Sequence, residues 1–491
     1  MQLGTSIRSG TLWLFTGNVS QRALEFFFGI ILARLLVPAD FGLLVMTQVF
    51  TGFAGFIAGG GMGQALIQSK DISARHYRVV FTLQLLICSI IYGVFYYSSP
   101  YIARFLDNPI YTDLLRVSTL NFLIRPFVNI SRAKLSRDMR FKSIAIISLL
   151  TLIVSSTSSI FLATQELGVW SLIYGGLIGS FLSALLFIIH SRTVPYFAYD
   201  KRLAKQLGGY GIKLTINDII EYLRRETPNF MIGKMLDSTM LGLFNKGVST
   251  SAIPLQTIAG SAYQTVFRAL SSTQDNIDKS KYIYLRTVTL VTVYTFPFYI
   301  ALIWLSEPFI MTVYGPKWQL AAIPLQIFSI SRLFSCLMNT AGAVLAAHNH
   351  LGVEIILQSL ALVLTAIGCW YGIQYNNLFY VSLGIIPAIL FLSFTMSFFA
   401  ARYIKATFKE FLTALDPAIQ LNLLLATTLA IGDYFLTLYN VESNSKKYLI
   451  IQSSAGGITY ALLFLYWPIK QLKSESARWK KLLKIPTANA A

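Results

Sequence analysis

The feature that most constrains this chain is a succession of apolar stretches, about fourteen in number, each long enough to cross a lipid bilayer as a helix. The connections between them are short, which leaves no room for a separate soluble domain. Charged residues make up 12% of the sequence, whereas a soluble globular protein carries about 25%. The sequence therefore predicts an all-α, polytopic membrane protein. The approximate cores of the predicted spans are residues 12–35, 41–66, 79–98, 114–133, 144–163, 168–189, 209–233, 240–267, 284–305, 319–346, 353–373, 378–400, 418–438 and 448–467.

The net charge of +19 would suggest nucleic acid binding in a soluble protein. If the N-terminus is cytoplasmic and the spans alternate, most Lys and Arg residues fall in the loops and the tail on the cytoplasmic side. The positive-inside rule predicts this asymmetry. We therefore expect both termini in the cytoplasm and no nucleic acid partner. The three cysteines show no disulfide or metal-binding spacing. His348 and His350 are spaced so that they could bind a metal, but a polar turn is the favoured interpretation.

The chain carries an internal duplication. Residues 99–109 resemble residues 307–316, at an offset near 208. Because an even number of spans separates the two halves, they have the same orientation, and we predict two six-helix lobes related by a pseudo-two-fold axis along the membrane normal. The predicted parts are an N-lobe at 1–200, a C-lobe at 201–405, and a C-terminal helix pair with a basic cytoplasmic tail at 406–491. At an offset of 200, the matched polar positions are Asn18 with Asp218, Gln21 with Glu221, and Glu25 with Arg225.

Charged and polar residues interrupt several spans, most clearly at residues 208–236. A charged side chain at the centre of the bilayer costs about 2.5–3.5 kcal/mol on insertion scales. Positions 218, 221 and 225 share one helical face, so we expect this segment to line a water-filled cavity. The candidate substrate-binding residues of this cationic cavity are Arg22, Arg125, Lys213, Arg224, Arg225, Lys246, Arg332, Asn18 and Gln21.

Basic groups outnumber acidic ones among these residues, which favours an anionic substrate, since a guanidinium binds phosphate bidentately. An alternative is that the charges form internal ion pairs. Arg22 with Glu25, and Glu221 with Arg225, have the helical spacing for such pairs. Glu25, Asp218 and Glu221 are candidates for coupling to H⁺ or Na⁺.

Glycines recur at intervals of four within two spans. The spacing of Gly55, Gly59 and Gly63, and of Gly175 and Gly179, predicts close helix packing, with a hinge as the alternative.

No catalytic or metal-binding constellation stands out. The sequence has no Walker A loop, and the glycines at 59–63 follow no strand, so they do not form a dinucleotide fingerprint. A membrane polymerase or ligase of glycans usually needs a large outer loop, and the longest predicted here are short. We therefore expect neither an enzyme nor a cofactor.

Two segments resemble a known family. The turn Leu-Leu-x-Pro-x-Asp-Phe-Gly at residues 35–42 and the segment Glu-Pro-Phe-Ile…Tyr-Gly-Pro-Lys-Trp at residues 307–318 are similar to those of Wzx-type flippases, the polysaccharide-transporter branch of the MOP superfamily. The chain looks most like the colanic-acid or exopolysaccharide type. The resemblance implies translocation of an undecaprenyl-pyrophosphate-linked oligosaccharide across the bacterial inner membrane by alternating access, coupled to an ion gradient.

The resemblance also implies roles for residues. Arginines in the first helix and the cavity of related flippases bind the diphosphate, and the matching positions here are Arg22, Arg125 and Arg225. Implied partners are the lipid-linked oligosaccharide, membrane lipids, and a polymerase or other polysaccharide-assembly proteins. The alternatives are an ion-coupled drug or metabolite exporter of the same superfamily, a membrane polymerase or ligase, and a scaffold. A cationic cavity disfavours the exporter because exported drugs are commonly cations.

Overall fold

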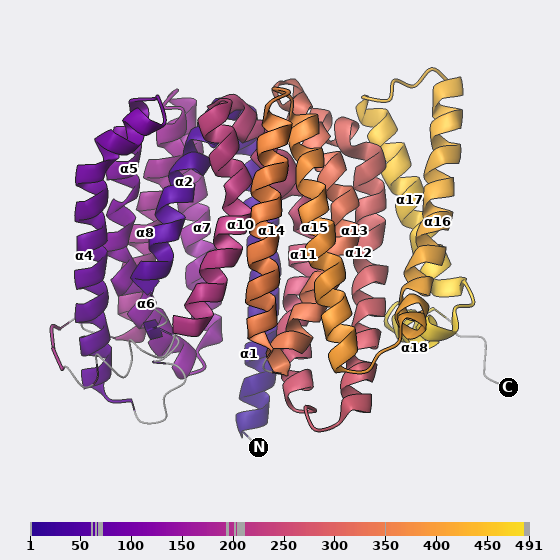
Figure 1. The fold of residues 1–491 in the computed structure, drawn as a ribbon, viewed down its shortest axis with the longest axis horizontal. Helices are drawn as coiled ribbons and strands as arrows, with labels where there is room; N and C mark the ends of the chain where they lie inside the picture. The colour runs from indigo at the N-terminus through magenta and orange to yellow at the C-terminus, as the bar shows by residue number, and fades with distance from the viewer. Residues whose placement is uncertain are drawn as a thin grey trace. The chain divides into compact units, whose positions relative to one another are not determined.

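The computed structural model describes residues 2–59, 62–63, 66, 72–192, 196–200, 203, 212–348 and 350–485. These residues form sixteen α-helices and two short 3₁₀ helices, with no strand among them. The chain divides into two compact units, Met1–Leu243 and Phe244–Ala491. Within each unit the long helices run side by side (Figure 1).

The described residues of the first unit form eight helices that lie wholly within it. They are α1 (Gln2–Leu35), α2 (Pro38–Gly59), α4 (Ala74–Phe105), α5 (Ile110–Ser118), α6 (Leu120–Arg137), α7 (Phe141–Thr164), α8 (Val169–Ser191) and α10 (Ile212–Met235). Helix α11 (Ser238–Ser271) begins in the first unit and continues into the second. Helix α10 packs against α2 of the first unit, and the division of the chain into lobes at residues 200 and 405 stays a prediction.

The second unit continues with the remaining helices. They are α12 (Ile277–Val313), η1 (Pro316–Ala321), α13 (Ala322–Ala347), α14 (Leu351–Ile373), α15 (Leu378–Tyr403), α16 (Phe408–Leu438), α17 (Lys446–Tyr466), η2 (Lys470–Leu472) and α18 (Lys473–Leu482). Helix α12 packs against α13, α16 and α17, so it connects the predicted C-terminal helix pair to the rest of this unit.

The described residues of each predicted span are mostly helical. Residues 60–61, 64–65 and 209–211 of two predicted spans lie outside the described residues. The span predicted at 114–133 is divided at Thr119, which separates α5 from α6 and whose hydroxyl donates a hydrogen bond to the carbonyl of Leu115 at 2.7 Å. Ten helical segments of the described chain are long and apolar enough to cross a membrane. The all-α membrane class predicted from the sequence is confirmed. Helices α1, α6, α10 and α11 fall outside these ten, and each carries at least one of the candidate cavity residues.

The helix boundaries recur at the offsets that the sequence comparison predicted. The break between α1 and α2 lies at residues 35–38, and the break between α10 and α11 lies 200 positions later, at 235–238. Helices α7 and α14 begin at Phe141 and Leu351, an offset of 210. These positions are consistent with the predicted duplication.

Two equivalent glycines make reciprocal backbone contacts within the first unit. A Cβ atom on Gly42 of α2 would lie 1.7 Å from the carbonyl oxygen of Ser238, the first residue of α11. A Cβ atom on Gly242 of α11 would lie 1.9 Å from the carbonyl oxygen of Pro38, the first residue of α2. Gly42 and Gly242 are 200 positions apart, as are Pro38 and Ser238. The N-terminal turns of α2 and α11 therefore pack against each other, and at each of the two contacts only glycine fits.

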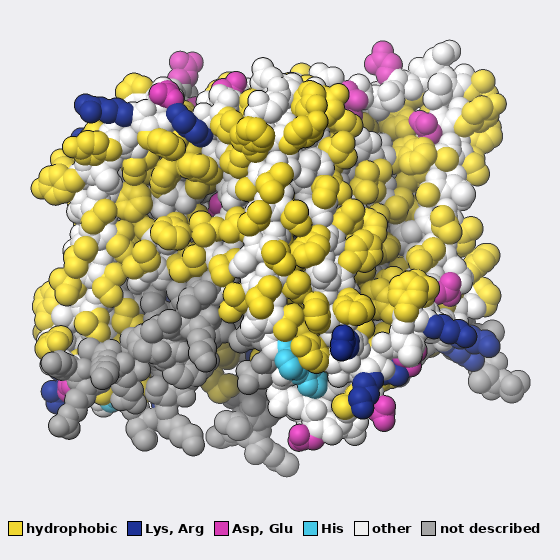
Figure 2. Space-filling view, in the orientation of Figure 1, with side chains coloured by type: hydrophobic (Ala, Val, Ile, Leu, Met, Phe, Trp, Pro, Cys, Tyr) yellow, Lys and Arg dark blue, Asp and Glu magenta, His cyan; other side chains and the backbone are white. Residues whose placement is uncertain are grey.

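Apolar side chains cover the outer surface of the second unit's helices between their ends (Figure 2). On α14, Ile356, Leu360, Val363 and Ile367 are exposed and recur at helical spacing. Such an exposed stripe is stable when it faces lipid rather than water.

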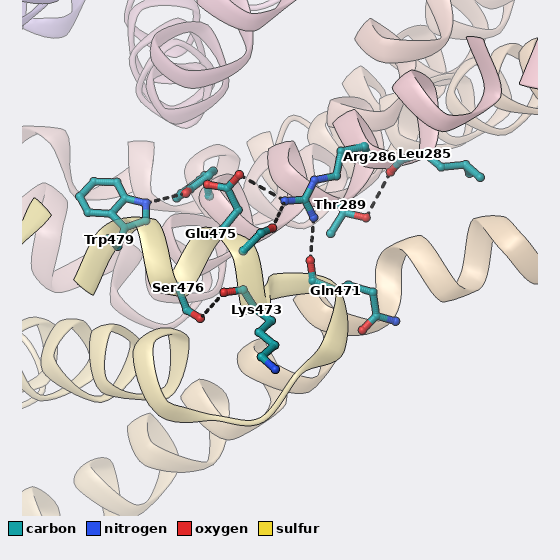
Figure 3. A network of polar contacts seen from close by, with 10 residues as sticks. Leu285, Arg286, Thr289, Gln471, Lys473, Glu475, Ser476 and Trp479 are labelled. Carbon is teal, nitrogen blue, oxygen red and sulfur yellow. Dashed lines mark hydrogen bonds and ion pairs between the residues drawn. The ribbon is translucent and has the colours of Figure 1, made fainter. Parts of the chain in front are cut away.

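The basic helix α18 is held against α12 by a polar network (Figure 3). Arg286 donates hydrogen bonds to the carbonyl of Gln471 at 2.7 Å and to the carboxylate of Glu475 at 3.2 Å. The indole N–H of Trp479 donates to the hydroxyl of Tyr294 at 2.8 Å. The C-terminal helix is therefore part of the packed second unit.

The reciprocal glycine contact gives a first prediction. We expect Gly42→Ala to destabilise the protein by about 1–3 kcal/mol, the usual cost of overpacking, because the new methyl group would meet backbone that cannot move aside. The control is Gly29→Ala in α1, where an added Cβ meets nothing within 4 Å and the helix gains up to about 1 kcal/mol. Thermal unfolding of the purified protein in detergent measures both, and equal midpoints would contradict the contact.

Candidate functional site

A cavity of about 680 Å³ lies among α1, α2, α5, α6, α7 and α8 of the first unit. Many of the residues that line it are polar, together with several apolar ones such as Phe56, Phe122 and Phe187. The polar side chains that line it are Gln21, Gln48, Thr51, Ser118, Asn121, Arg125, Arg132, Ser148, Thr151, Ser155, Ser180 and Ser183. Hydroxyls and amides both donate and accept hydrogen bonds, so this wall is suited to a ligand that carries many hydroxyl groups.

Helices α7 and α8 meet closely at this wall. A Cβ on Gly175 would lie 1.9 Å from the Ser159 hydroxyl oxygen, and a Cβ on Gly179 would lie 2.6 Å from the Cβ of Ser155. The Ser155 hydroxyl also donates to the carbonyl of Gly175 at 2.9 Å. The close packing predicted for this glycine pair is confirmed.

The same packing prediction is wrong for Gly59 and Gly63 of the other glycine series. A Cβ on either residue would meet nothing within 4 Å. Gly55, the first glycine of the series Gly55, Gly59 and Gly63, makes room for the side chain of Arg125 and not for the backbone of another helix. A Cβ there would lie 2.9 Å from Nη1 of Arg125.

Arg125 lines the cavity from α6, one turn after the buried residue Phe122. Phe122 is 5% exposed and packs with Ala54, Cys88 and Ile91 of α2 and α4, which fixes this turn of α6. The guanidinium of Arg125 forms no hydrogen bond or ion pair with any described residue, and it lies beside the glycine at position 55. A half-buried cation without an acidic partner favours an anion in the cavity.

A second arginine, Arg132, lines the same cavity two turns further along α6. No Asp or Glu is present among the described residues that line it. The cavity therefore combines two cationic groups with a wall of hydroxyls and amides. Among the described residues, no group of three or more His, Cys, Asp or Glu side chains is placed to hold a metal ion.

Helix α10 is anchored beside this cavity by Tyr222. Its hydroxyl donates to the carbonyls of Gln48 at 3.0 Å and Val49 at 2.8 Å on α2. Arg225 lies 5.6 Å from the centre of the Tyr222 ring and pairs with Glu226 at 3.1 Å. The ion pair of Arg225 is thus made with the adjacent residue and not with Glu221, the partner that the helical spacing offered.

The other candidates on α10 are dispersed. Asp218 is exposed and Glu221 is half-buried, and neither lines the cavity. Arg224 is half-buried and makes a polar, ring or electrostatic contact with another part of the chain. Lys213 belongs to the first turn of α10, and its side chain lies outside the described residues.

On α1, Gln21 is the candidate that lines the cavity, and its amide donates to the carboxylate of Glu25 at 2.8 Å. Asn18, Arg22 and Glu25 are exposed and are not among the lining residues. The structure therefore brings Gln21 and Arg125 together in one cavity.

Two candidates belong to the second unit. The ammonium group of Lys246 lies 4.7 Å from the ring centre of Tyr314 and 5.0 Å from that of Trp318, a cation–π arrangement. The Nε atom of Arg332 is buried and has no hydrogen-bond partner among the described residues. A buried donor of this kind is costly unless a ligand or water satisfies it.

Sequence reasoning missed most of the hydroxyl wall, although a signal was present. Ser148, Thr151 and Ser155 of α7 are spaced i, i+3, i+7 and so form one stripe. Serine and threonine barely alter the hydropathy of a span, so these residues are inconspicuous beside charged ones. Arg132 lies at the end of a predicted span, where the positive-inside rule already accounts for a basic residue.

The fold is that of a known class of membrane transporter. The structure superposes on lipid II flippase MurJ in its inward closed conformation with a TM-score of 0.72 and 16% sequence identity, covering 96% of this chain and 99% of MurJ. Together with the ten apolar helices, this likeness establishes a multi-pass membrane protein.

The sequence matches the family described as polysaccharide biosynthesis protein over residues 31–323, and the chain belongs to that family. The teichuronic acid biosynthesis protein TuaB of Bacillus subtilis (strain 168) is 23% identical over 488 residues, 97% of this chain and 98% of TuaB. The lipopolysaccharide biosynthesis protein WzxC of Escherichia coli (strain K12) is 23% identical over 349 residues, 71% of each chain. The Wzx-type resemblance found in the sequence is thereby confirmed.

The geometry predicts which face of α8 meets water. Ser183 lines the cavity, whereas Leu185 is 47% exposed on the outer surface. In lipid vesicles, we expect Ser183→Cys to react with a water-soluble maleimide at least about tenfold faster than Leu185→Cys, because the thiolate forms and reacts in water rather than in hydrocarbon. The three native cysteines are buried, so the unaltered protein serves as the blank. Equal labelling of both variants would show that the cavity is dry.

Proposed function

We propose that this protein translocates an undecaprenyl-pyrophosphate-linked oligosaccharide across the bacterial inner membrane, for the synthesis of an exopolysaccharide, O-antigen or capsule. The observation that carries the proposal is the cavity of the first unit, in which Arg125 has no acidic partner and the wall is rich in hydroxyls and amides. A pyrophosphate provides the anion that such arginines bind, and an oligosaccharide provides the hydroxyls.

The names of similar proteins support the same substrate class. MurJ is a lipid II flippase, and TuaB and WzxC are biosynthesis proteins of teichuronic acid and lipopolysaccharide. Each name connects the fold or the family to an envelope polysaccharide or its lipid-linked precursor. The competing function, export of drugs or metabolites, is disfavoured by a cavity that carries cations and lacks carboxylates among its described residues.

We assign the diphosphate to Arg125 first, because it lines the cavity without an ion-pair partner. Gln21 is the proposed hydrogen-bonding partner of the sugar units. The other proposed substrate-binding residues keep this role as part of the proposal, namely Asn18, Arg22, Lys213, Arg224, Arg225, Lys246 and Arg332. Glu25, Asp218 and Glu221 remain the proposed carriers of a coupling H⁺ or Na⁺.

Transport by alternating access needs a contact that closes one end of the cavity and then opens. In the first unit, Lys234 of α10 pairs with Asp107, which follows α4. Beside this pair, the rings of Phe105 and Phe230 stack with centres 6.2 Å apart. We propose that this contact is broken and remade in each cycle. With both termini cytoplasmic, as the Lys and Arg distribution favours, it would lie at the periplasmic face, where a polymerase would receive the product.

Replacing Arg125 tests the site. We expect Arg125→Ala to lower translocation of the lipid-linked oligosaccharide in reconstituted vesicles at least about tenfold, since one charge-assisted hydrogen bond contributes about 1.5–3 kcal/mol. Arg125→Lys should retain partial activity because a point charge does not reproduce the planar fork. The matched control is Lys142→Ala, an exposed cation of the same unit that does not line the cavity. Normal transport by Arg125→Ala, or robust dye efflux without movement of the oligosaccharide, would refute the proposal.

A disulfide tests the closing contact. We expect Phe105→Cys/Phe230→Cys to form a disulfide upon oxidation, because the two side chains meet at this contact, and to stop transport. Reduction should restore it. Each single cysteine variant, treated with the same oxidant, controls for damage elsewhere. A cross-linked protein that transports at the normal rate would show that these helices do not separate.

A further inference from the structure

A second cavity, of about 320 Å³, lies at the end of the first unit where α4 begins and α8 ends. We call it the α4–α8 pocket and define it by Tyr77, Arg78, Phe81, Phe127, Lys134 and Arg192, which all line it. It shares no lining residue with the polar cavity described above. Its role is therefore a separate question from that of the transport site.

Three cations from three structural elements converge on this pocket. Arg78 belongs to α4, Lys134 to α6, and Arg192 caps the C-terminal end of α8. Lys134 donates a hydrogen bond to the carbonyl of Ser191 at 2.8 Å, which fixes its position. The guanidinium groups of Arg78 and Arg192 form no ion pair with any described residue. No Asp or Glu is present among the described residues that line the pocket.

The floor of the pocket is apolar. Phe81 and Ile130 are each 3% exposed and belong to a buried cluster of α4 and α6. Phe127 packs edge-on against Phe81, with ring centres 5.0 Å apart. A soluble anion would make no apolar contact with these rings. An amphiphile would place its charged group among the cations and its hydrocarbon against the aromatic rings.

The segment 196–200, which follows α8, is attached to α4 beside this pocket. The guanidinium of Arg78 lies 5.3 Å from the ring centre of Tyr196, and the N–H of Ala198 donates to the Thr82 hydroxyl at 3.0 Å. Asp200 pairs with Arg75 at 3.1 Å, so this carboxylate is already neutralised. A ligand in the pocket would contact both α4 and the start of the connection that leads towards α10.

Basic residues at helix ends are common in membrane proteins because they set topology, and charge alone does not make a site. The distinguishing observations here are a cavity of about 320 Å³, two arginines without acidic partners among the described residues, and the aromatic floor. We propose that the α4–α8 pocket binds an anionic phospholipid of the surrounding leaflet, with its phosphate between Arg78, Lys134 and Arg192 and its first acyl carbons on Phe81 and Phe127.

Selective lipid retention tests the proposal. The full-length protein is purified in a neutral detergent, mixed with equal amounts of phosphatidylglycerol and phosphatidylcholine, and analysed by native mass spectrometry. We expect the unaltered protein to retain phosphatidylglycerol preferentially and Arg78→Gln/Arg192→Gln to lose this preference about tenfold or more. The control Lys142→Gln/Lys279→Gln removes two exposed charges that do not line the pocket and should retain the preference.

Three results would overturn the proposal. One is an unchanged preference in Arg78→Gln/Arg192→Gln, and another is an equal loss in the control variant. The third is binding of sodium pyrophosphate to the protein in phosphatidylcholine nanodiscs, lost in Arg78→Gln/Arg192→Gln, which would make the ligand a soluble anion. If that variant does not fold, Arg78→Lys/Arg192→Lys replaces it and should bind phosphatidylglycerol with an intermediate preference, because it keeps the charge without the planar forks. Full retention by the lysine variant would also contradict the phosphate contact.

Discussion

A guanidinium inside a bundle of apolar helices is tolerated only where water or a partner compensates its charge. Arg125 meets this condition in an unusual way, because it forms no ion pair with a described carboxylate and lines a cavity that many hydroxyls and amides also line. Water in the cavity can offset the cost of holding this cation. In the proposed function, the diphosphate of the substrate takes the place of that water.

Glycine provides the space on which this arrangement depends, in three physically different ways. Gly55 leaves room for the Arg125 guanidinium, whereas Gly175 and Gly179 let α8 approach α7 until the glycines contact Ser155 and Ser159. Gly42 and Gly242 bring two helix starts into reciprocal backbone contact. A spacing of four residues is common to two of these groups, so spacing alone does not reveal whether a glycine makes room for a helix or for a side chain.

The sequence was sufficient for the class of fold and for the family, because apolar length and charge asymmetry are properties of the chain itself. It also singled out Arg125 and Gln21, which line one cavity, since a charged or amide side chain inside a span is conspicuous. It did not reveal that Arg225 pairs with Glu226, because adjacent residues point to different sides of a helix and only the rotamers bring them together. The serines of α7 and α8 were missed because a hydroxyl that returns a hydrogen bond to its own helix, as Thr157 does to Ile153, costs little in lipid.

The basic residues of this chain fall into two groups, those that pair with a carboxylate and those that line a cavity without one. Several cations at the helix ends are neutralised by a carboxylate, as in Lys281 with Glu410 and Arg286 with Glu475, and these pairs fasten one helix to another. The cations of the two cavities in the first unit have no such partner among the described residues that line them. Topology requires only that positive charge be on one side of the membrane, and paired charges satisfy that requirement as well as unpaired ones. Topology therefore does not account for the lack of an acidic partner for Arg125 and Arg78 among the described residues, and the anionic ligands proposed for the two cavities would provide one.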